Sequence, residues 1–477
     1  MSDVLDSSPA VAAVAPPEKF WATIGEALKG SRRDYTTGPI GRAILLLAIP
    51  MVLEMVLESV FAVVDVFWVS KLGPDAVATV GITESMLALI YAVAIGLSMA
   101  AMATVARRTG EKDPEGASSA AVQAVALGIS IAVPIGIFGA VFAPKLLSTM
   151  GASPSIVASG SGFTRVMLGG NVVILLLFLI NAIFRGAGDA AIAMRVLWLA
   201  NVINLILDPC LIFGLGPFPA LGVQGAAVAT TCGRGIGVLV QVFTLFGGHR
   251  RIVIARRHLV IDPRVMLRML RLSGNAILQV SIGTASWIGL VRILSSFGSA
   301  ALAGYTIAIR VLVFALLPSW GMANAAATMV GQSLGAGKPE RAEKAVWIAG
   351  FYNMIFLGSV GLVFILLTRP LIELFTTDPA VVPIAVACLR TVAYGFVFYA
   401  YGMVMVQAFN GAGDTFTPTI INLFCFWLFE IPLAYTLAKG FGFGPQGVFW
   451  AIAIAFSTVA VVGSIAFRSG RWKRKKV

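Results

Sequence analysis

Three acidic residues lie within one long apolar segment near the start of the chain, where an ionised side chain is costly. The segment reads IPMVLEMVLESVFAVVDVFWV and contains Glu54, Glu58 and Asp65. In a helix that advances by about 100° per residue, Glu58 lies about 40° and Asp65 about 20° from Glu54. Three carboxyl groups on one narrow face cannot all face lipid, so this face must line a bundle interior or a wet cavity. Glu54 and Glu58 lie deeper, where carboxylates could attract a cationic ligand.

A second polar pair lies in the apolar segment VINLILDPCLIFG. Asn204 and Asp208 are four residues apart and share one helical face, and Pro209 disturbs the helix directly after the acid. If this segment and the first cross a membrane in the same direction, Asp65 and Asp208 lie at similar depth and can approach one another. Burial and a second carboxylate both disfavour the charged form of such a group. The pair could therefore take up a proton from outside, as ion-coupled transport requires.

A structural interpretation of the same acids stays open. They could be neutral, or hydrogen-bonded locally, without any part in chemistry. We favour the coupling role for Asp65 and Asp208, whereas for Glu54 and Glu58 the two interpretations carry equal weight. Pro50 precedes all four acids and is a candidate hinge, because proline removes a helix hydrogen bond.

The chain repeats itself at a nearly fixed offset. FRGAGD (184–189) returns as FNGAGD (409–414), 225 positions later, and LGVQGA (221–226) returns as FGPQGV (443–448) at an offset of 222. An internal duplication on this scale is typical of transporters built from two related lobes. Both GAGD motifs fall where an apolar segment ends, so we expect their glycines to end one helix and their aspartates to cap the next.

The duplication does not repeat the acids. Gln279 occupies the position equivalent to Glu54, and Leu290 the position equivalent to Asp65. Charges within the apolar segments of the second half are mainly Arg292, Arg310, Arg390 and Glu430. We therefore expect ion coupling in the first half and a second half that completes the cavity, with Gln279 on its wall.

Composition places this duplication in a membrane. Of the 477 residues, 58% are hydrophobic and 12% are charged, roughly half the charged fraction of an average soluble protein. Stretches of about 20 apolar residues span a bilayer as helices, and twelve occur, near 43–69, 80–104, 119–142, 161–184, 191–214, 222–246, 268–294, 302–328, 345–367, 384–408, 416–438 and 446–467. The expected fold class is an all-α polytopic membrane protein, with twelve transmembrane helices in two pseudo-symmetric six-helix bundles.

Charge placement predicts the topology. The net charge is +13, and most lysines and arginines fall in segments that share one side of the membrane with the N-terminus. This bias puts both termini in the cytoplasm of a cell whose inner (plasma) membrane holds the protein, and it explains the basic clusters without a nucleic-acid partner. The predicted units are an N-terminal cytoplasmic segment with a possible interfacial helix, an N-lobe, a basic linker, a C-lobe and a basic tail: 1–38, 39–247, 248–267, 268–468 and 469–477.

Other kinds of chemistry find no support in the residues. The four cysteines lie in apolar segments without paired ligand spacing, which argues against disulfides and metal sites. GQSLGAGKPERAEKA (331–345) lacks the phosphate-loop consensus. No catalytic cluster is visible, so we expect neither an enzyme nor a cofactor other than a coupling ion.

The six-plus-six segments, VDVFWVSKLG after the first acids, the paired [RN]GAGD loops and NLILDP together resemble the multidrug and toxic compound extrusion (MATE) family over about residues 38–468. The resemblance implies antiporters that export organic cations and amphipathic toxins against inward H⁺ or Na⁺. In the branch resembling the DNA-damage-inducible type, it implies an ion site that maps onto Asp65, Asn204 and Asp208, and less securely Asn181. The acids of the other bacterial branch, in segments 7 and 10, are absent here.

We therefore expect a monomeric exporter of organic cations or amphipathic metabolites, driven by H⁺ or, as the second choice, Na⁺. The alternative is a lipid-linked saccharide flippase of the same wider superfamily, which would need a basic cavity for pyrophosphate. Arg292 and Arg310 keep that alternative open. A membrane-embedded enzyme would need a catalytic cluster, and a channel would need a repeated filter; neither is visible.

Overall fold

The computed structural model describes residues 20–31, 33–247 and 251–475 of the chain. In this part, eleven helices are long and apolar enough to span a membrane, and the pair α13–α14, bent by 58°, forms a twelfth span. The predicted fold class, a polytopic all-α membrane protein of two related six-helix bundles, is confirmed. The predicted domain boundaries stay predictions, and residues 1–19, Arg32, 248–250 and 476–477 lie outside the described residues.

The two lobes use the same order of elements. The N-lobe consists of α2 (Ile40–Ser70), α3 (Pro74–Gly110), α4 (Pro114–Thr149), α5 (Pro154–Gly169), α6 (Asn171–Ala187), α7 (Ala190–Phe213) and α8 (Val223–Phe246). The C-lobe consists of α9 (Pro263–Ser295), α10 (Ser299–Gly335), α11 (Pro339–Leu366), α12 (Thr368–Glu373), α13 (Val382–Ala393), α14 (Phe396–Gly411), α15 (Phe416–Asn422), the π-helix η2 (Leu423–Glu430), α16 (Ile431–Tyr435), the π-helix η3 (Thr436–Gly440) and α17 (Pro445–Arg468). Outside the lobes lie α1 (Phe20–Lys29), η1 (Arg256–His258) and η4 (Arg471–Arg474).

Backbone conformation follows the duplication. Gly73 and Gly298, which directly precede α3 and α10, have φ of 98° and 97°. Gly222 and Gly444, which directly precede α8 and α17, have φ of 57° and 60°. Side chains disfavour this region, so glycine is required at both members of each pair. The repeat seen in the sequence is therefore a repeat of local structure.

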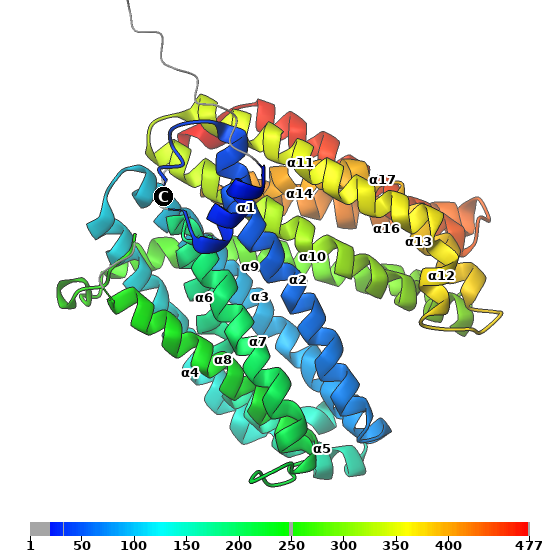
Figure 1. Cartoon of the computed structure of the whole chain (residues 1–477). Helices are drawn as coiled ribbons and strands as arrows, with labels where there is room; N and C mark the ends of the chain where they lie inside the picture. Colours follow the sequence, from blue (N-terminus) through cyan, green and yellow to red (C-terminus); the bar gives the residue numbers. More distant parts are fainter. Residues whose placement is uncertain (1–19, 32, 248–250, 476–477) are drawn as a thin grey trace, which may run out of the picture.

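The lobes meet most closely at one end of the molecule, which also carries α1 and η4. A Cβ atom at Gly110 of α3 would lie 2.0 Å from the carbonyl oxygen of Gln332, and one at Gly335 of α10 would lie 2.1 Å from that of Arg107. Only glycine lets these two helices approach so closely. We call this the closed end, because the helices of the two lobes diverge from it toward the opposite, open end (Figure 1).

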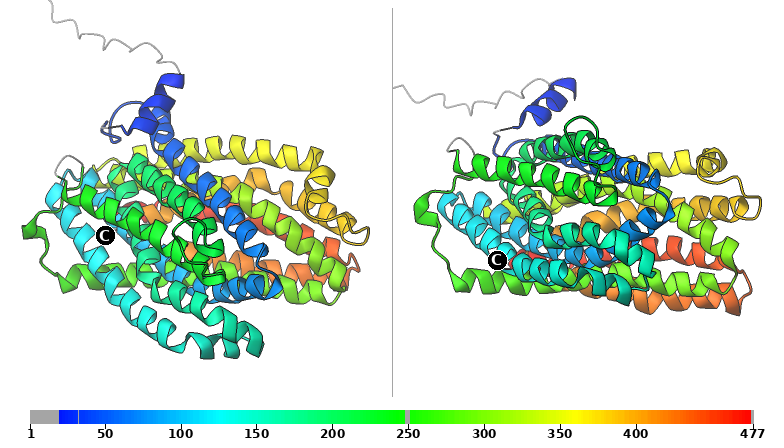
Figure 2. Two further views of the ribbon diagram at one scale, coloured as in Figure 1. Left: turned by 60° about the horizontal axis from the view of Figure 1, so that its bottom comes forward. Right: turned by 90° about the horizontal axis from the view of Figure 1, so that it is seen from below.

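Helix α1 lies outside the helix bundle, beside the beginning of α2 (Figure 2). Thr23 and Ala27 are buried, whereas the Trp21 side chain is 77% exposed. The sequence predicts a helix within residues 18–35 with Phe20, Trp21, Ile24 and Leu28 on one side, and a helix forms over a shorter range, Phe20–Lys29. Its location at a membrane surface stays a prediction.

Candidate functional site

A cavity lies between the lobes. Its N-lobe part has a volume of about 220 Å³ and is lined by residues of α2, α3 and α6, and its C-lobe part has a volume of about 270 Å³. Both parts share Met99, Trp320 and Gln407 on their walls, so they adjoin each other at these side chains. Tyr91 and Phe178 stack edge-to-face on the N-lobe wall, with ring centroids 5.8 Å apart. The walls are thus mainly apolar and aromatic, with a few polar groups.

Glu54 lines the N-lobe part of the cavity and is 1% exposed. Its carboxylate accepts a hydrogen bond from the Asn181 amide at 3.1 Å and lies 3.9 Å from the Arg185 guanidinium. Asn181 in turn accepts a hydrogen bond from Gln241 at 2.6 Å. A buried acid thus has a cation and an amide as partners, as a charge in this location requires.

Glu58 lies farther along the same helix and has its own arginine. The Arg234 guanidinium donates to the Glu58 carboxylate at 3.1 Å and to the Tyr91 hydroxyl at 3.2 Å. Arg234 is 5% exposed and also lies over the Phe61 ring, 5.4 Å from its centroid. The negative charge of Glu58 is therefore balanced from behind the cavity wall.

Asp65 and Asp208 come from α2 and α7 and lie close enough to interact electrostatically. The Asn204 amide donates to the Asp208 carboxyl at 3.3 Å and to the Thr230 hydroxyl at 3.1 Å. One buried carboxyl oxygen of each aspartate has no hydrogen-bond partner among the described residues. A proton on either oxygen would remove part of the cost of burying these groups.

The structure brings three of the four predicted coupling residues together. Asp65, Asn204 and Asp208 form one group, whereas Asn181 lies with Glu54. The resemblance to the family predicted that Asn181 belongs to the ion site. The Asn181 amide instead bridges Glu54 and Gln241, because Asn181 lies near the closed end of α6.

The predicted cavity residues all lie on the cavity walls. Glu54 and Glu58 line the N-lobe part, and Gln279 lines the C-lobe part. The candidate hinge Pro50 is buried within α2, which continues through it to Ser70. These placements leave the functional roles as predictions.

Arg185 and Arg234 are the site residues that the sequence reasoning missed. Arg234 lies inside an apolar segment, and the cost of a charge there was the signal that should have identified it. Arg185 was passed over because it belongs to the FRGAGD motif, interpreted as a helix end. Within the described residues, neither Arg292 nor Arg310 forms an ion pair with Glu430.

The two GAGD motifs end helices as predicted, but their aspartates differ. Gly188 and Gly413 have φ of 87° and 81°. Asp414 accepts hydrogen bonds from the backbone and hydroxyl of Thr417, whereas Asp189 makes no such cap and pairs with Arg251 at 3.5 Å. The capping prediction is therefore correct for the second motif and wrong for the first, where a linker arginine competes for the carboxylate.

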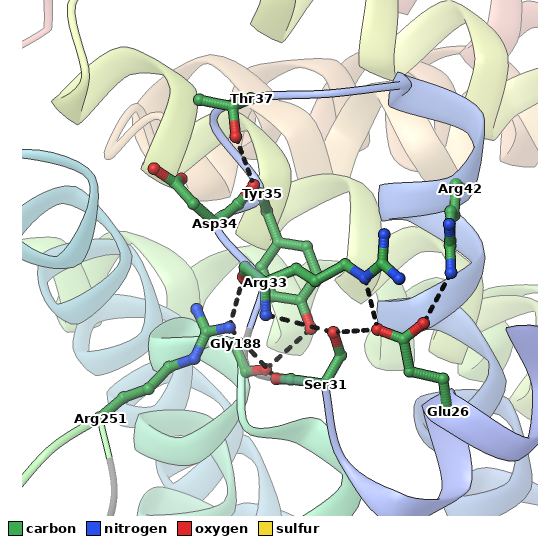
Figure 3. Close-up of polar contacts among 9 residues, drawn as sticks. All are labelled: Glu26, Ser31, Arg33, Asp34, Tyr35, Thr37, Arg42, Gly188 and Arg251. Atoms are coloured by element: carbon green, nitrogen blue, oxygen red, sulfur yellow. Dashed lines mark hydrogen bonds and ion pairs between the residues drawn. The ribbon is translucent and has the colours of Figure 1, made fainter. Parts of the chain in front are cut away.

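Residues 33–38, which we call the strap, bind both lobes at the closed end. Toward the N-lobe, the Tyr35 hydroxyl donates to the Gly188 carbonyl at 3.3 Å, and Arg251 donates to the Arg33 carbonyl at 2.5 Å (Figure 3). Toward the C-lobe, the Arg341 guanidinium donates to the carbonyl groups of Tyr35, Thr37 and Gly38, each at 2.8 Å. The lobes cannot separate here unless one set of these bonds breaks.

Glu26 of α1 anchors the start of this segment. Its carboxylate accepts hydrogen bonds from Ser31 at 2.8 Å and from Arg33 and Arg42, each at 2.7 Å (Figure 3). Partial burial alone would raise the pKa of Glu26, but these three donors together hold that pKa below its ordinary value. The anchor is therefore a charged one at neutral pH.

Comparison with known proteins assigns a family to this arrangement. The family model MatE matches residues 50–210 and 275–436. A probable multidrug resistance protein, NorM, of Thermotoga maritima is 27% identical over 92% of this chain and 94% of its own. An FAD transporter of Shewanella oneidensis is 25% identical over 84% of this chain and 89% of its own. A solved structure described as the outward-facing conformation of a multidrug resistance MATE family transporter superposes with a TM-score of 0.86, at 28% identity, over 92% of this chain and 98% of that one.

Proposed function

The chain belongs to the MATE family and is a multi-pass membrane protein, and from that premise we propose that it is an antiporter. It exports organic cations or other amphipathic compounds through the central cavity in exchange for inward H⁺, with Na⁺ as the less favoured ion. The observation that carries the proposal is the group formed by Asp65 and Asp208, where two buried carboxyl oxygens lack hydrogen-bond partners among the described residues.

Arg234 offers a physical link between the coupling group and the cavity. It donates to Glu58 on the cavity wall, and it also interacts electrostatically with Asp65. While Asp65 is charged, the two acids share one positive charge. When Asp65 takes up a proton, Arg234 neutralises Glu58 more completely, and a bound cation loses part of its attraction. Ion and substrate then compete through one arginine, and coupling is the resulting difference in affinity.

The orientation follows from the same cycle. With the closed end toward the cytoplasm, the open end of the cavity faces outside, where protons enter and substrate leaves. Both termini are then cytoplasmic, in the plasma (inner) membrane. The inward-facing state requires that the strap release one lobe, since Arg341 and Arg251 hold it from opposite sides. The protein acts as a monomer in this proposal, because each chain contains a complete cavity.

The charge pattern of the cavity favours an exporter of amphipathic compounds over a pyrophosphate-lipid flippase. Arg185 on the cavity wall and Arg234 behind it each already face an acid, Glu54 and Glu58 respectively. A pyrophosphate group would need cations without such partners. One relative is described as an FAD transporter, so a phosphate-bearing aromatic metabolite is the second candidate cargo, and Arg185 could contact it only after releasing Glu54.

Efflux from vesicles under separately imposed pH and Na⁺ gradients tests the proposal. A fluorescent organic cation serves as the probe, FAD as the competitor, and Asp65→Asn and Asp208→Asn as the variants. Asp75→Asn is the matched control, because Asp75 lies in the first turn of α3 and its carboxylate accepts a hydrogen bond from the exposed Ser155 hydroxyl, away from the coupling group. The proposal is supported if Asp65→Asn and Asp208→Asn lose pH-driven efflux and Asp75→Asn does not. If both variants pump normally, the hypothesis of ion coupling at this site is wrong.

A further inference from the structure

Glu430 is a buried acid that the proposed cycle does not use. It ends the π-helix η2 and is 2% exposed. The described residues provide neither a hydrogen bond nor an ion pair to its carboxyl group. The titratable groups that interact with it electrostatically are Tyr305 of α10, Tyr399 of α14 and Cys425 of η2 itself. None of these carries a positive charge, and no charged residue of α9 or α17, which also pack on η2, acts on it.

The duplication places Glu430 at the position of Asn204, a member of the N-lobe coupling group. The backbone bonds from Leu221 to Leu211 and from Phe443 to Leu437 make Leu211 and Leu437 equivalent, so the offset within this span is 226 (437 minus 211). At that offset position 204 corresponds to position 430. The C-lobe therefore carries an acid at one position of the coupling group.

The other members of the coupling group are replaced by apolar residues in the C-lobe. Leu290 stands in place of Asp65 at the 225-residue offset, Ala434 in place of Asp208 at the 226-residue offset, and Ile452 in place of Thr230 at the 222-residue offset. All three replacements belong to the apolar core of the C-lobe. The corresponding helices remain in contact, because a Cβ atom at Gly289 would lie 2.7 Å from the Ile431 side chain.

A carboxylate in these surroundings would be a buried charge without a counter-ion, which is a costly arrangement. A protonated carboxyl group removes that cost. We propose that Glu430 is a second proton-binding site, in the C-lobe, which holds a proton in the state described here and exchanges it with the cavity when the lobes move. This inference rests on the proposed antiport and deepens it, because the C-lobe then carries a proton of its own in each cycle.

A short path leads from Glu430 to the cavity. Phe426 lies one turn before Glu430, and both Phe426 and Tyr399 line the C-lobe part of the cavity. The backbone from Phe426 to Glu430 is π-helical, a pattern frequent at functional sites. Pro432 lacks the amide hydrogen that would strengthen the next turn. A change in the hydrogen-bond pattern of this stretch would turn Glu430 relative to Phe426.

The first test compares proton stoichiometry in proteoliposomes with a fluorescent organic cation and an internal pH dye. The proteins are the wild type, Glu430→Gln and the control Glu373→Gln, whose acid is exposed and paired with Arg369. We expect Glu430→Gln to lower the number of protons exchanged per cation by one, and the control to leave it unchanged. An unchanged ratio in Glu430→Gln overturns the C-lobe site alone. A wild type that exchanges no protons overturns the proposal of proton-coupled antiport itself.

Two further measurements do not depend on transport. Because glutamine mimics a protonated carboxyl group, Glu430→Gln should melt at the wild-type temperature near pH 7 and above it at pH 9, where deprotonation penalises the wild type. A melting temperature several degrees below the wild type at pH 7 would instead assign Glu430 a charged structural role. In the wild type, dicyclohexylcarbodiimide, which modifies protonated carboxyl groups, should label Glu430 in a pH-dependent manner by mass spectrometry; failure to label while Asp208 is labelled contradicts the proposal.

Discussion

The N-lobe and the C-lobe share one backbone plan and differ in what their helices carry. Gly73 and Gly298 adopt the same conformation at equivalent helix starts, yet the charged pairs of the cavity all belong to the N-lobe. On the C-lobe wall the position of Glu54 is taken by Gln279. Duplication thus conserved the geometry that lets two bundles move against each other. The chemistry diverged, because a transporter needs only one lobe to change charge strongly.

Among the differences between the lobes, we expect substitution of the buried Arg234–Glu58 pair in the N-lobe to have the largest effect. Arg234→Gln leaves Glu58 without its cation, and breaking a buried pair in this way costs about 3–5 kcal/mol of stability, here toward the low end because Glu58 is partly exposed. Thermal melting of the purified protein measures the loss. The double variant Arg234→Gln with Glu58→Gln should recover most of it, and Arg108→Gln at a surface pair should cost almost nothing. Equal losses at Arg234 and Arg108 would contradict the assignment of Arg234 as a buried counter-ion.

A second prediction concerns transport rather than stability. Asp65→Asn should lower pH-driven efflux by roughly 10- to 100-fold, within the usual range of coupling between two sites. Leu290→Asn at the equivalent position in the C-lobe should lower it much less, since no ion pair depends on Leu290. Initial efflux rates from vesicles provide the comparison. Similar losses in both variants would mean that the lobes contribute equally.

The strap tests whether the two lobes are held together from the N-terminal side. Arg341→Gln removes four of the bonds from the C-lobe to the strap, and at about 1 kcal/mol for each bond the closed end should open more often. Spin-label distances across the closed end, between α3 and α10, should become longer or broader. Arg369→Gln, at the other end of the C-lobe, is the control. Unchanged distances in Arg341→Gln would show that the helix contacts alone hold the closed end.

We expect the smallest effect from the pH dependence of Glu26, the residue that anchors the strap. The pKa of Glu26 is held below its ordinary value in the folded protein, so its contribution is present at neutral pH and is lost as pH falls through the lowered pKa. Backbone hydrogen exchange of residues 26–38 should therefore increase in acid relative to its intrinsic pH dependence. Glu26→Gln should show faster exchange already at pH 7 and little further change. If hydrogen exchange in the wild type and in Glu26→Gln increases equally in acid, Glu26 is not the cause of the increase.

Much of the fold could be predicted because it depends on patterns within single helices. Twelve apolar segments and two repeated motifs established the number of spans and the duplication. A helical period placed Glu54, Glu58 and Asp65 on one face, and the structure places the first two on the cavity wall. The predicted approach of Asp65 to Asp208 required only that two helices run in the same direction at the same depth.

The partners of the acids could not be predicted in the same way. Asn181 was grouped with Asp208 but bonds to Glu54, and Arg185 and Arg234 were not considered as partners at all. Which side chains meet depends on how neighbouring helices are rotated and shifted against one another. The period of a single helix contains no information about that arrangement.

The sequence by itself determined the membrane location, the two lobes and the asymmetry between a first half with clustered acids and a second half without that cluster, because hydrophobicity and repetition are properties of the chain. Only the tertiary structure decided that each cavity acid has its own arginine, that the strap joins both lobes, and that Glu430 is buried without a charged partner in the described structure. These features arise where helices far apart in the sequence pack together, and there the low dielectric makes each charge depend on its neighbours.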